Sequence, residues 1–287
     1  MITGKTQVYG LIGNPVSQSF SPFIHNKLAE EMSIDMTYVT FPVAKGQVPE
    51  AFKGMLALGI RGMNVTVPFK SDIMACIDSV DQEAKTIGAV NTLVFRDRGV
   101  RGYNTDWLGL RQSLYNKQVS LRDKKVLILG AGGSARATAV MCAKEGAAEI
   151  TIANRTVAKA DTIAEIIRSN YSVEVFTSRI CDILDGCQPD IIFQTTPIGM
   201  YPKPGVSPLD NDRLLTCAEV AVDLIYNPDE TLFLKQARDN GCQVINGLEM
   251  LFYQAVKAFE LWHDLEVPED IQNRSLAAFE KAIREKN

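Results

Sequence analysis

The sequence predicts an α/β protein with two domains, and three observations support this prediction. The chain has 287 residues, which is longer than most single domains. Strand-like and helical stretches alternate along most of it, a pattern typical of sheets covered by helices. In the second half, a strand-like stretch runs into a glycine-rich turn, Gly130 to Ala135, which opens a helical stretch.

The composition is that of a folded globular protein. Hydrophobic residues make up 46% of the chain and charged residues 22%, which excludes general disorder. The net charge of −4 gives no general attraction for nucleic acid or for an anionic membrane. The longest uncharged stretch, residues 6–26, contains Pro15, Pro22 and several serines, so it is not a membrane span. We therefore expect a small-molecule substrate as partner, and neither nucleic acid nor a membrane.

Cysteine and histidine indicate no metal site. The six cysteines form no C-x-x-C pair, and the two histidines, His25 and His263, lie far apart in the sequence. This arrangement is typical of neither a zinc site nor a disulfide framework. No basic segment precedes an apolar run, as it would in a secretory signal. We expect a cytoplasmic protein without a metal, for which a monomer and a homodimer are both compatible with the sequence.

Hydrophobic periodicity predicts the elements of the first domain, residues 1–106. Strands are expected where residues of high β-propensity lie between turns, and helices where apolar residues recur every three or four positions. The predicted strands are 7–13, 37–43, 62–68 and 89–96, and the predicted helices are 21–33 and 47–58. A turn-rich stretch, residues 97–106, then leads into a helix at 108–116.

The alternation is more regular in the second domain, residues 107–247. The predicted strands are 126–129, 150–153, 173–176, 191–195 and 220–225, and the predicted helices are 134–145 and 157–169. A short apolar run follows at residues 243–245. Parallel strands joined by helices account for this order most simply. Residues 248–287 contain two further helical stretches, 248–262 and 271–283, which we expect to pack back on the first domain. A ligand-binding cleft is expected between the two domains.

The glycine-rich turn predicts a Rossmann-type domain that binds a dinucleotide. Gly130 permits a tight turn, Gly132 lets a pyrophosphate approach the backbone, and Ala135 lets the helix lie close to the sheet. Ala131, Gly133 and Ser134 complete the turn. The helix N-terminus would supply N–H groups and a partial positive charge for the phosphates. A turn that serves only close packing is the weaker interpretation, because this one lies within a βαβ unit of suitable length, residues 124–153.

The residues after the second strand of this unit favour NADP over NAD. NAD-binding domains usually carry Asp or Glu about 20 residues after the turn, to bind the ribose 2′-hydroxyl. Here the segment is Asn154, Arg155 and Thr156, with Lys159 one helical turn further on. A guanidinium and an ammonium fit a 2′-phosphate. Cations in the first turn of a helix also oppose its dipole, so a bound anion would explain their position.

Three polar clusters are predicted to follow strands of the first domain, and open α/β sheets bind their ligands at the carboxyl ends of parallel strands. They are Ser17 to Ser21, Asn64 to Lys70, and Asn91 and Thr92 together with Asn104 to Asp106. Some of these residues have a simple structural explanation. Ser21 could cap a helix, and Asn104 could form a turn. Lys70 has no such explanation.

These segments, taken with the second half, resemble the shikimate dehydrogenase family, including its quinate/shikimate members. The match spans nearly the whole chain. It is carried by GNPVSQSFSPFIHN (13–26), NVTVPFK (64–70), GAVNTL (88–93), GYNTD (102–106), GAGGSARA (130–137), NRTVAKA (154–160), TTPIGM (195–200), DLIYNP (223–228) and NGLEML (246–251) with Gln254. The resemblance implies NADPH-dependent, reversible reduction of 3-dehydroshikimate to shikimate, on the route to aromatic amino acids.

The resemblance also implies roles for individual residues. Lys70 and Asp106 would form the catalytic pair. The substrate carboxylate would be held by Ser19 and Ser21, and the ring hydroxyls by Asn64, Thr66, Asn91, Asp106 and Gln254. Tyr226 would line the pocket, and NADP would contact Gly130 to Ser134, Asn154 to Lys159, Leu224 and Gly247. The residue types agree with this, because hydride transfer at an alcohol also requires a proton to move, and with histidine scarce Lys70 is the better candidate for that transfer.

The chain departs from the family pattern at several positions. The family usually has His where this chain has Gln18, Asn at Gln194, and Gly at Trp107 and Glu249. None of these changes removes a predicted catalytic group, but Trp107 and Glu249 leave the substrate and cofactor preference open. One alternative is therefore a quinate or dual-substrate dehydrogenase that accepts NAD, against which Arg155 argues. Another is a dinucleotide-binding regulator without turnover, against which Lys70 and Asp106 argue.

Overall fold

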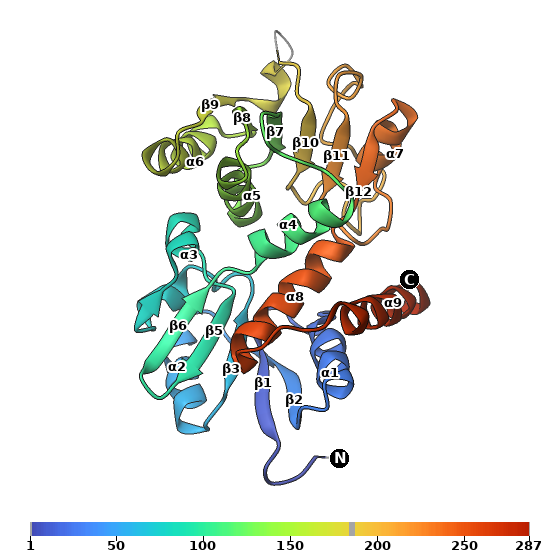
Figure 1. Cartoon of the computed structure of the whole chain (residues 1–287). Coiled ribbons are helices and arrows are strands. Elements are labelled where there is room, and N and C mark those ends of the chain that lie inside the picture. Colours follow the sequence, from blue (N-terminus) through green and yellow to red (C-terminus); the bar gives the residue numbers. More distant parts are fainter. Residues whose placement is uncertain (1, 184–186, 287) are drawn as a thin grey trace. The chain divides into compact units, whose positions relative to one another are not determined.

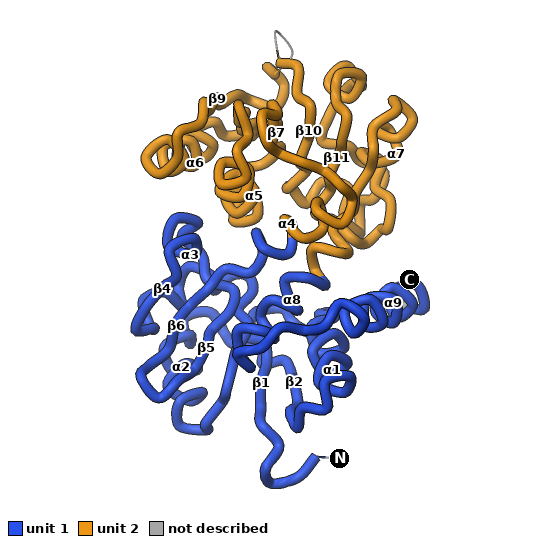
Figure 2. Tube along the Cα trace, in the orientation of Figure 1, with its two compact units in different colours: residues 1–109, 252–287 blue, residues 110–251 orange. Residues whose placement is uncertain are grey.

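The computed structural model describes residues 2–183 and 187–286, and the chain divides into two compact units (Figure 2). Unit 1 comprises residues 1–109 and 252–287, and unit 2 comprises residues 110–251. The chain passes from one unit to the other within helices α4 (Asp106–Asn116) and α8 (Leu248–His263). Each unit contains a sheet with helices packed on it, which confirms the predicted α/β class.

The sheet of unit 1 is mixed, with the strand order β2-β1-β3-β5-β6-β4. Its strands are β1 (Gln7–Gly13), β2 (Met36–Pro42), β3 (Gly62–Val65), β4 (Ser79–Val80), β5 (Thr92–Arg96) and β6 (Gly99–Tyr103). β1 is parallel to β2 and β3, whereas β5 is antiparallel to both β3 and β6. The start of β5 therefore lies at the same end of the sheet as the carboxyl ends of β1, β3 and β6.

Opposite faces of this sheet are covered by α2 (Val48–Ala57) and α8. Successive strand residues point to opposite faces. Ile12 of β1 packs in a core cluster with Phe52 of α2, whereas the ring of Tyr9 contacts that of Trp262 in α8 at 5.1 Å between centroids. Trp262 also explains the glycine at position 62, because a Cβ there would lie 2.5 Å from the indole ring.

Helices α1 (Ser21–Glu31) and α9 (Glu269–Lys286) come from distant parts of the sequence and lie side by side in unit 1 (Figure 1). The rings of Phe20 and Phe279 meet edge to face, with 5.8 Å between centroids. At the surface, Arg274 of α9 forms an ion pair with Glu31 of α1. The remaining short helices of this unit are η1 (Asp72–Ala75) and α3 (Gln82–Ile87).

The sheet of unit 2 is parallel throughout, as predicted, with the strand order β12-β11-β10-β7-β8-β9. Its strands are β7 (Lys125–Leu129), β8 (Glu149–Ala153), β9 (Glu174–Ser178), β10 (Ile191–Gln194), β11 (Val220–Asp223) and β12 (Gln243–Ile245). Its helices are α5 (Gly133–Lys144), α6 (Val157–Asn170), η2 (Ile180–Asp182) and α7 (Leu232–Asp239). The strand order reverses at β7, which has β8 on one side and β10 on the other. Open α/β sheets bind ligands at such a reversal.

Most predicted strands and helices are present, and the differences have local causes. The strand predicted at 62–68 ends at Val65, because Pro68 has no N–H for the sheet and residues 67–68 form a turn. The strand predicted from Ala89 begins at Thr92, because the N–H of Ala89 still bonds the end of α3. The stretch 97–106, expected to be turns, contains β6. β4, α3 and α7 were not predicted. β4 and α3 are too short for a clear periodicity, whereas the buried residues of α7, Phe233, Leu234 and Ala237, do recur at helical spacing.

Candidate active site

The mixed sheet of unit 1 brings three polar segments to one end. In the strand register, Asn64 of β3 lies opposite Thr92 of β5, and Thr92 lies opposite Tyr103 of β6. Asn91 comes just before β5, and Asp106 follows β6 at the start of α4. One of these positions corrects the sequence interpretation. Asn91 and Thr92 border the amino end of an antiparallel strand and do not follow a strand.

Lys70 and Asp106 form an ion pair at this end of the sheet. The Nζ of Lys70 lies 2.6 Å from the Oδ2 of Asp106, and the two side chains are 26% and 16% exposed. The backbone carbonyl of Lys70 accepts from the N–H of Val90, and the N–H of Asp106 donates to the Oδ1 of Asn104. Asp106 is also the first residue of a helix, where a carboxylate is favoured by the helix dipole. The pair is thus held by backbone contacts and still reached by solvent.

Asn91 and Asn64 join this pair to a buried hydrogen-bond network. The Nδ2 of Asn91 donates to the Oδ1 of Asp106 at 2.8 Å and to the hydroxyl of Thr105 at 3.0 Å. The Nδ2 of Asn64 donates to the hydroxyl of Thr92 at 3.0 Å, and that hydroxyl donates to the Oδ1 of Asn91. Two charged groups are therefore oriented by amides and hydroxyls that are themselves almost fully buried.

The other predicted substrate residues of unit 1 lie on neighbouring elements. Ser19 and Ser21 stand at the start of α1, and the Ser19 hydroxyl donates to that of Ser21 at 3.1 Å. Thr66 follows β3, two positions after Asn64, and is half-buried. Gln254 is buried in α8. Hydroxyls at a helix N-terminus can bind an anionic group, and the amides and the ion pair can bind hydroxyls and exchange a proton.

The glycine-rich turn of unit 2 lies between β7 and α5. Gly130 has a φ of +114°, and a Cβ there would lie 2.5 Å from the hydroxyl oxygen of Thr195, so only glycine fits. A Cβ at Gly132 or Gly133 would meet nothing within 4 Å, so their backbone faces open space. Ala131 and Ser134 complete the turn, and Ala135, in the first turn of α5, is fully buried. The first N–H groups of α5 have no helical carbonyl to bond. This turn fits a dinucleotide pyrophosphate.

The segment after β8 presents two cations at the start of α6. Arg155 and Lys159 are both exposed, and neither forms an ion pair with any residue that the structure describes. The side chain of Asn154 donates to the carbonyl of Thr156, which fixes the turn before the helix. Cations without a carboxylate partner at a helix N-terminus suit a phosphate monoester.

Three other predicted residues of unit 2 lie near the end of β11. A Cβ at Gly247 would lie 2.1 Å from the carbonyl oxygen of Leu224, so the two backbones approach as closely as glycine allows. The N–H of Gly247 donates to the carbonyl of Ile225. Tyr226 comes directly after Ile225 and is half-buried, and this burial raises the pKa of its phenol. Leu224 and Gly247 are thus brought together on one side of the sheet reversal.

Two departures from the family pattern are structurally accommodated. The carboxylate of Glu249 lies 2.6 Å from the Nζ of Lys117, just after α4, and accepts from the side chain of Asn116 at 3.1 Å, so its charge is neutralised locally. Gln194 is fully buried, and its side chain bonds the backbone of Thr196 and Ile198. Trp107 is buried beside Asp106 in the chain.

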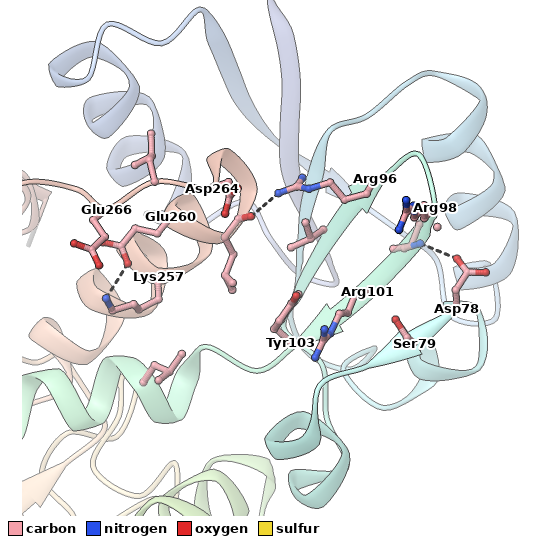
Figure 3. A pocket seen from close by; sticks show the side chains of 16 residues that line it. Asp78, Ser79, Arg96, Arg98, Arg101, Tyr103, Lys257, Glu260, Asp264 and Glu266 are labelled. Atoms are coloured by element: carbon pink, nitrogen blue, oxygen red, sulfur yellow. Dashed lines mark hydrogen bonds and ion pairs between the residues drawn. The ribbon is translucent and has the colours of Figure 1, made fainter.

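A separate hollow of about 700 Å³ lies elsewhere on unit 1, between the β5–β6 hairpin and the end of α8 (Figure 3). None of the predicted substrate residues lines it. Its charged side chains mostly contact each other or the backbone. Arg96 donates to the carbonyls of Leu261 and Trp262, and Lys257 pairs with Glu260. The hollow therefore has neither the Lys70–Asp106 ion pair nor the amide network of the candidate active site.

Tyr38 was missing from the predicted residues, whereas Thr92 and Thr105 were in the predicted polar clusters but had no predicted role. The Oη of Tyr38 donates to the Oδ1 of Asn64 at 2.8 Å, and Thr105 bonds Asn91 through both its N–H and its hydroxyl. The sequence does indicate the two threonines, because Thr92 follows Asn91 and Thr105 lies directly before Asp106. Tyr38 carries no such signal, because its segment looks like any buried strand.

Among the residues that the structure describes, each helix is either too short or too polar to span a membrane. The described ranges contain no group of three or more His, Cys, Asp or Glu residues placed to hold a metal ion.

Comparisons with known proteins match most of the chain. Family models match residues 11–93 (shikimate dehydrogenase substrate binding domain), 113–198 (shikimate / quinate 5-dehydrogenase) and 247–271 (shikimate 5′-dehydrogenase C-terminal domain). The shikimate dehydrogenase (NADP(+)) of Caldanaerobacter subterraneus subsp. tengcongensis is 45% identical over 261 residues, which cover 91% of this chain and 93% of that protein.

Solved structures agree with these matches. A shikimate dehydrogenase in complex with NADP⁺ has a TM-score of 0.89 at 41% identity, with 97% of each chain covered. The shikimate 5-dehydrogenase of Listeria monocytogenes, in complex with shikimate and NAD, also has a TM-score of 0.89, at 34% identity and with 96% of this chain and 98% of that chain covered.

Proposed function

Since the chain belongs to the shikimate dehydrogenase family, we propose that it interconverts 3-dehydroshikimate and shikimate by NADP-dependent hydride transfer, in the pathway to chorismate and the aromatic amino acids. The observation that carries this proposal is the ion pair of Lys70 and Asp106 within a network of amides and hydroxyls. Such a network suits a polyhydroxylated ring, and the pair suits proton exchange at one of its oxygens.

We assign the substrate contacts to residues of unit 1 and of the segment after β11. Ser19 and Ser21 hold the substrate carboxylate at the N-terminus of α1, where hydroxyls and the helix dipole favour an anion. The ring hydroxyls are held by Asn64, Thr66, Asn91, Asp106 and Gln254, and Tyr226 lines the pocket. In the oxidative direction the reacting hydroxyl gives its proton to the Lys70–Asp106 pair, and in the reductive direction the pair returns it.

NADP is assigned to unit 2. Residues 130–134 bind the pyrophosphate, Asn154 to Lys159 bind the adenosine end with its 2′-phosphate, and Leu224 and Gly247 contact the remainder. When bound, NADP accepts or supplies the hydride. The open space at Gly132 supports this assignment, as do the exposed charges of Arg155 and Lys159, which pair with no carboxylate of the residues that the structure describes.

The proposed partners are these small molecules only, with the protein acting as a monomer or a homodimer. Its cysteines are all free thiols, which suits a reducing compartment, and we place the protein in the cytoplasm.

A panel of two substrates and two cofactors tests this function. The purified protein is mixed with shikimate or quinate, each with NADP⁺ or NAD⁺, and nicotinamide absorbance is followed. We expect the highest kcat/KM for shikimate with NADP⁺. A higher value for quinate or for NAD⁺ would favour the dual-substrate alternative, and dinucleotide binding without turnover of either substrate would favour a regulator.

A further inference from the structure

Tyr38 is a buried strand residue that the roles assigned so far leave out. Its side chain is 1% exposed, and its hydroxyl donates to the Oδ1 of Asn64 at 2.8 Å. A buried phenol normally finds a hydrogen-bond partner. Here the partner is a proposed substrate residue, so the phenol affects how that residue faces a ligand.

The backbone carbonyl of Asn91 decides the orientation of the Asn64 amide. The Nδ2 of Asn64 donates to this carbonyl at 3.1 Å and to the hydroxyl of Thr92 at 3.0 Å. Because a carbonyl can only accept, the amide nitrogen faces Asn91, and the Oδ1 faces Tyr38. Both N–H groups are then used within the protein. What Asn64 has left for a ligand is a lone pair on Oδ1, which can only accept a hydrogen bond.

Helix α1 holds Tyr38 in place from one side. The side chain of Asn26 bonds both the N–H and the carbonyl of Tyr38, at 2.9 and 3.0 Å. The ring of His25 stacks on that of Tyr38, with 4.3 Å between centroids and 17° between planes. Burial lowers the pKa of His25 to about 3, so this imidazole is neutral. Burial also raises the pKa of Tyr38, opposed by a hydrogen bond from Ser21, so the phenol keeps its proton.

We infer that Tyr38 is a positioning residue, which fixes Asn64 so that its Oδ1 accepts a hydrogen bond from a ring hydroxyl of the substrate. The inference rests on the proposed function, because it takes shikimate as the ligand. Tyr38 acts through Asn64 and leaves the Lys70–Asp106 pair untouched. Loss of its hydroxyl should therefore weaken substrate binding more than it slows the chemical step.

The variant Tyr38→Phe keeps the stacked ring and removes only the hydroxyl, which donates to Asn64 and accepts from Ser21. We expect its KM for shikimate to rise about tenfold, the equivalent of one net hydrogen bond. Its kcat should stay within about threefold of the wild-type value, and its KM for NADP⁺ should not change. The matched control is Tyr9→Phe. Tyr9 is also a buried strand residue, 2% exposed, and its hydroxyl donates to Gln7, outside the network. This control should keep the wild-type KM.

A double-mutant cycle shows whether Tyr38 works through Asn64. Asn64→Ala should raise the KM for shikimate, and adding Tyr38→Phe to it should have no further effect. Independent, multiplying effects of the two substitutions would overturn the inference, as would an unchanged KM in Tyr38→Phe. If the wild-type protein oxidises no shikimate at all, the proposed function fails instead, so the two failures are distinguishable.

Discussion

Arg155 is the residue on which the preference for NADP depends most directly. Its guanidinium is exposed at the start of α6, and within the described part of the chain no carboxylate pairs with it. Arg155→Asp should raise the Kd for NADP⁺ by about 10- to 100-fold, because a charge-assisted hydrogen bond is lost and a carboxylate then faces the 2′-phosphate. The Kd for NAD⁺, which has no such phosphate, should change little.

Isothermal titration calorimetry with NADP⁺ and with NAD⁺ measures both dissociation constants. Arg155→Ala serves as the control that removes the cation without adding a negative charge, and its loss of affinity should be smaller. An unchanged ratio of the two dissociation constants in Arg155→Asp would show that the 2′-phosphate is bound elsewhere.

Glu249 shows how a single unexpected residue can be compensated locally. A free carboxylate in the place of the usual glycine would repel a phosphate-bearing cofactor. Its ion pair with Lys117 and its hydrogen bond from Asn116 neutralise that charge. We therefore retain the NADP assignment that Arg155 and Lys159 support.

At the scale of elements, Asp223 joins the end of β11 to the start of α7. Its fully buried carboxylate accepts from the N–H of Ile225 at 3.0 Å and from the hydroxyl of Thr231 at 2.6 Å, and Thr231 is the N-cap of α7. Burial raises the pKa of Asp223 to about 6, against an ordinary value of 3.8. The folded state therefore holds this proton more tightly than the unfolded state does.

The sign of the resulting pH dependence follows from that shift. Between about pH 4 and pH 6 the folded state binds more protons, so the contribution of Asp223 to stability falls as the pH rises, by roughly 3 kcal/mol in total. Asp223→Asn has no proton to lose. Relative to the wild type, its free energy of unfolding should increase from pH 4 to pH 7, as measured by urea titration.

Asp270 of α9 provides a control, because its pKa is shifted in the opposite direction to that of Asp223. A hydrogen bond from Arg274 lowers the pKa of the exposed Asp270, so Asp270→Asn should lose a little stability above the range in which that carboxylate ionises. Parallel pH profiles for Asp223→Asn and the wild type would contradict the pKa assigned to Asp223.

The sequence predicts the elements of this fold better than their directions. Hydrophobic periodicity and turn residues locate β1 and α6 closely, because each element is long enough for its apolar residues to show a repeat. The antiparallel course of β5 has no such signature, since it depends on pairing with β3 and β6. That course is what places Asn91 next to Asp106, so the network could not be predicted from spacing alone.

The sequence likewise indicates some residues of the candidate site and not others. Lys70 stands out in the sequence because it has no simple structural explanation, and the glycine-rich turn stands out because it lies within a βαβ unit of suitable length. The pairing of Lys70 with Asp106 is implied by the resemblance to the family. Tyr38 does not stand out, because its role comes from a hydrogen bond between strands that lie 26 residues apart in the chain.

At the scale of the whole molecule, the two units carry different parts of the chemistry. Unit 1 contains the ion pair and the amide network, and unit 2 contains the glycine-rich turn and the exposed cations Arg155 and Lys159. A change confined to the ion pair should therefore stop the reaction and leave NADP binding intact. Lys70 is the residue with which this separation is tested, because the proton transfer is assigned to it.

The most direct measurement is the kcat of Lys70→Ala for shikimate oxidation, together with its Kd for NADP⁺. We expect kcat to fall by about 10²- to 10⁴-fold, the usual contribution of a positioned acid or base, with the Kd unchanged. Lys53→Ala, which removes an exposed lysine of α2, should match the wild type in both. A kcat for Lys70→Ala close to that of Lys53→Ala would contradict the assignment of the proton transfer to the Lys70–Asp106 pair.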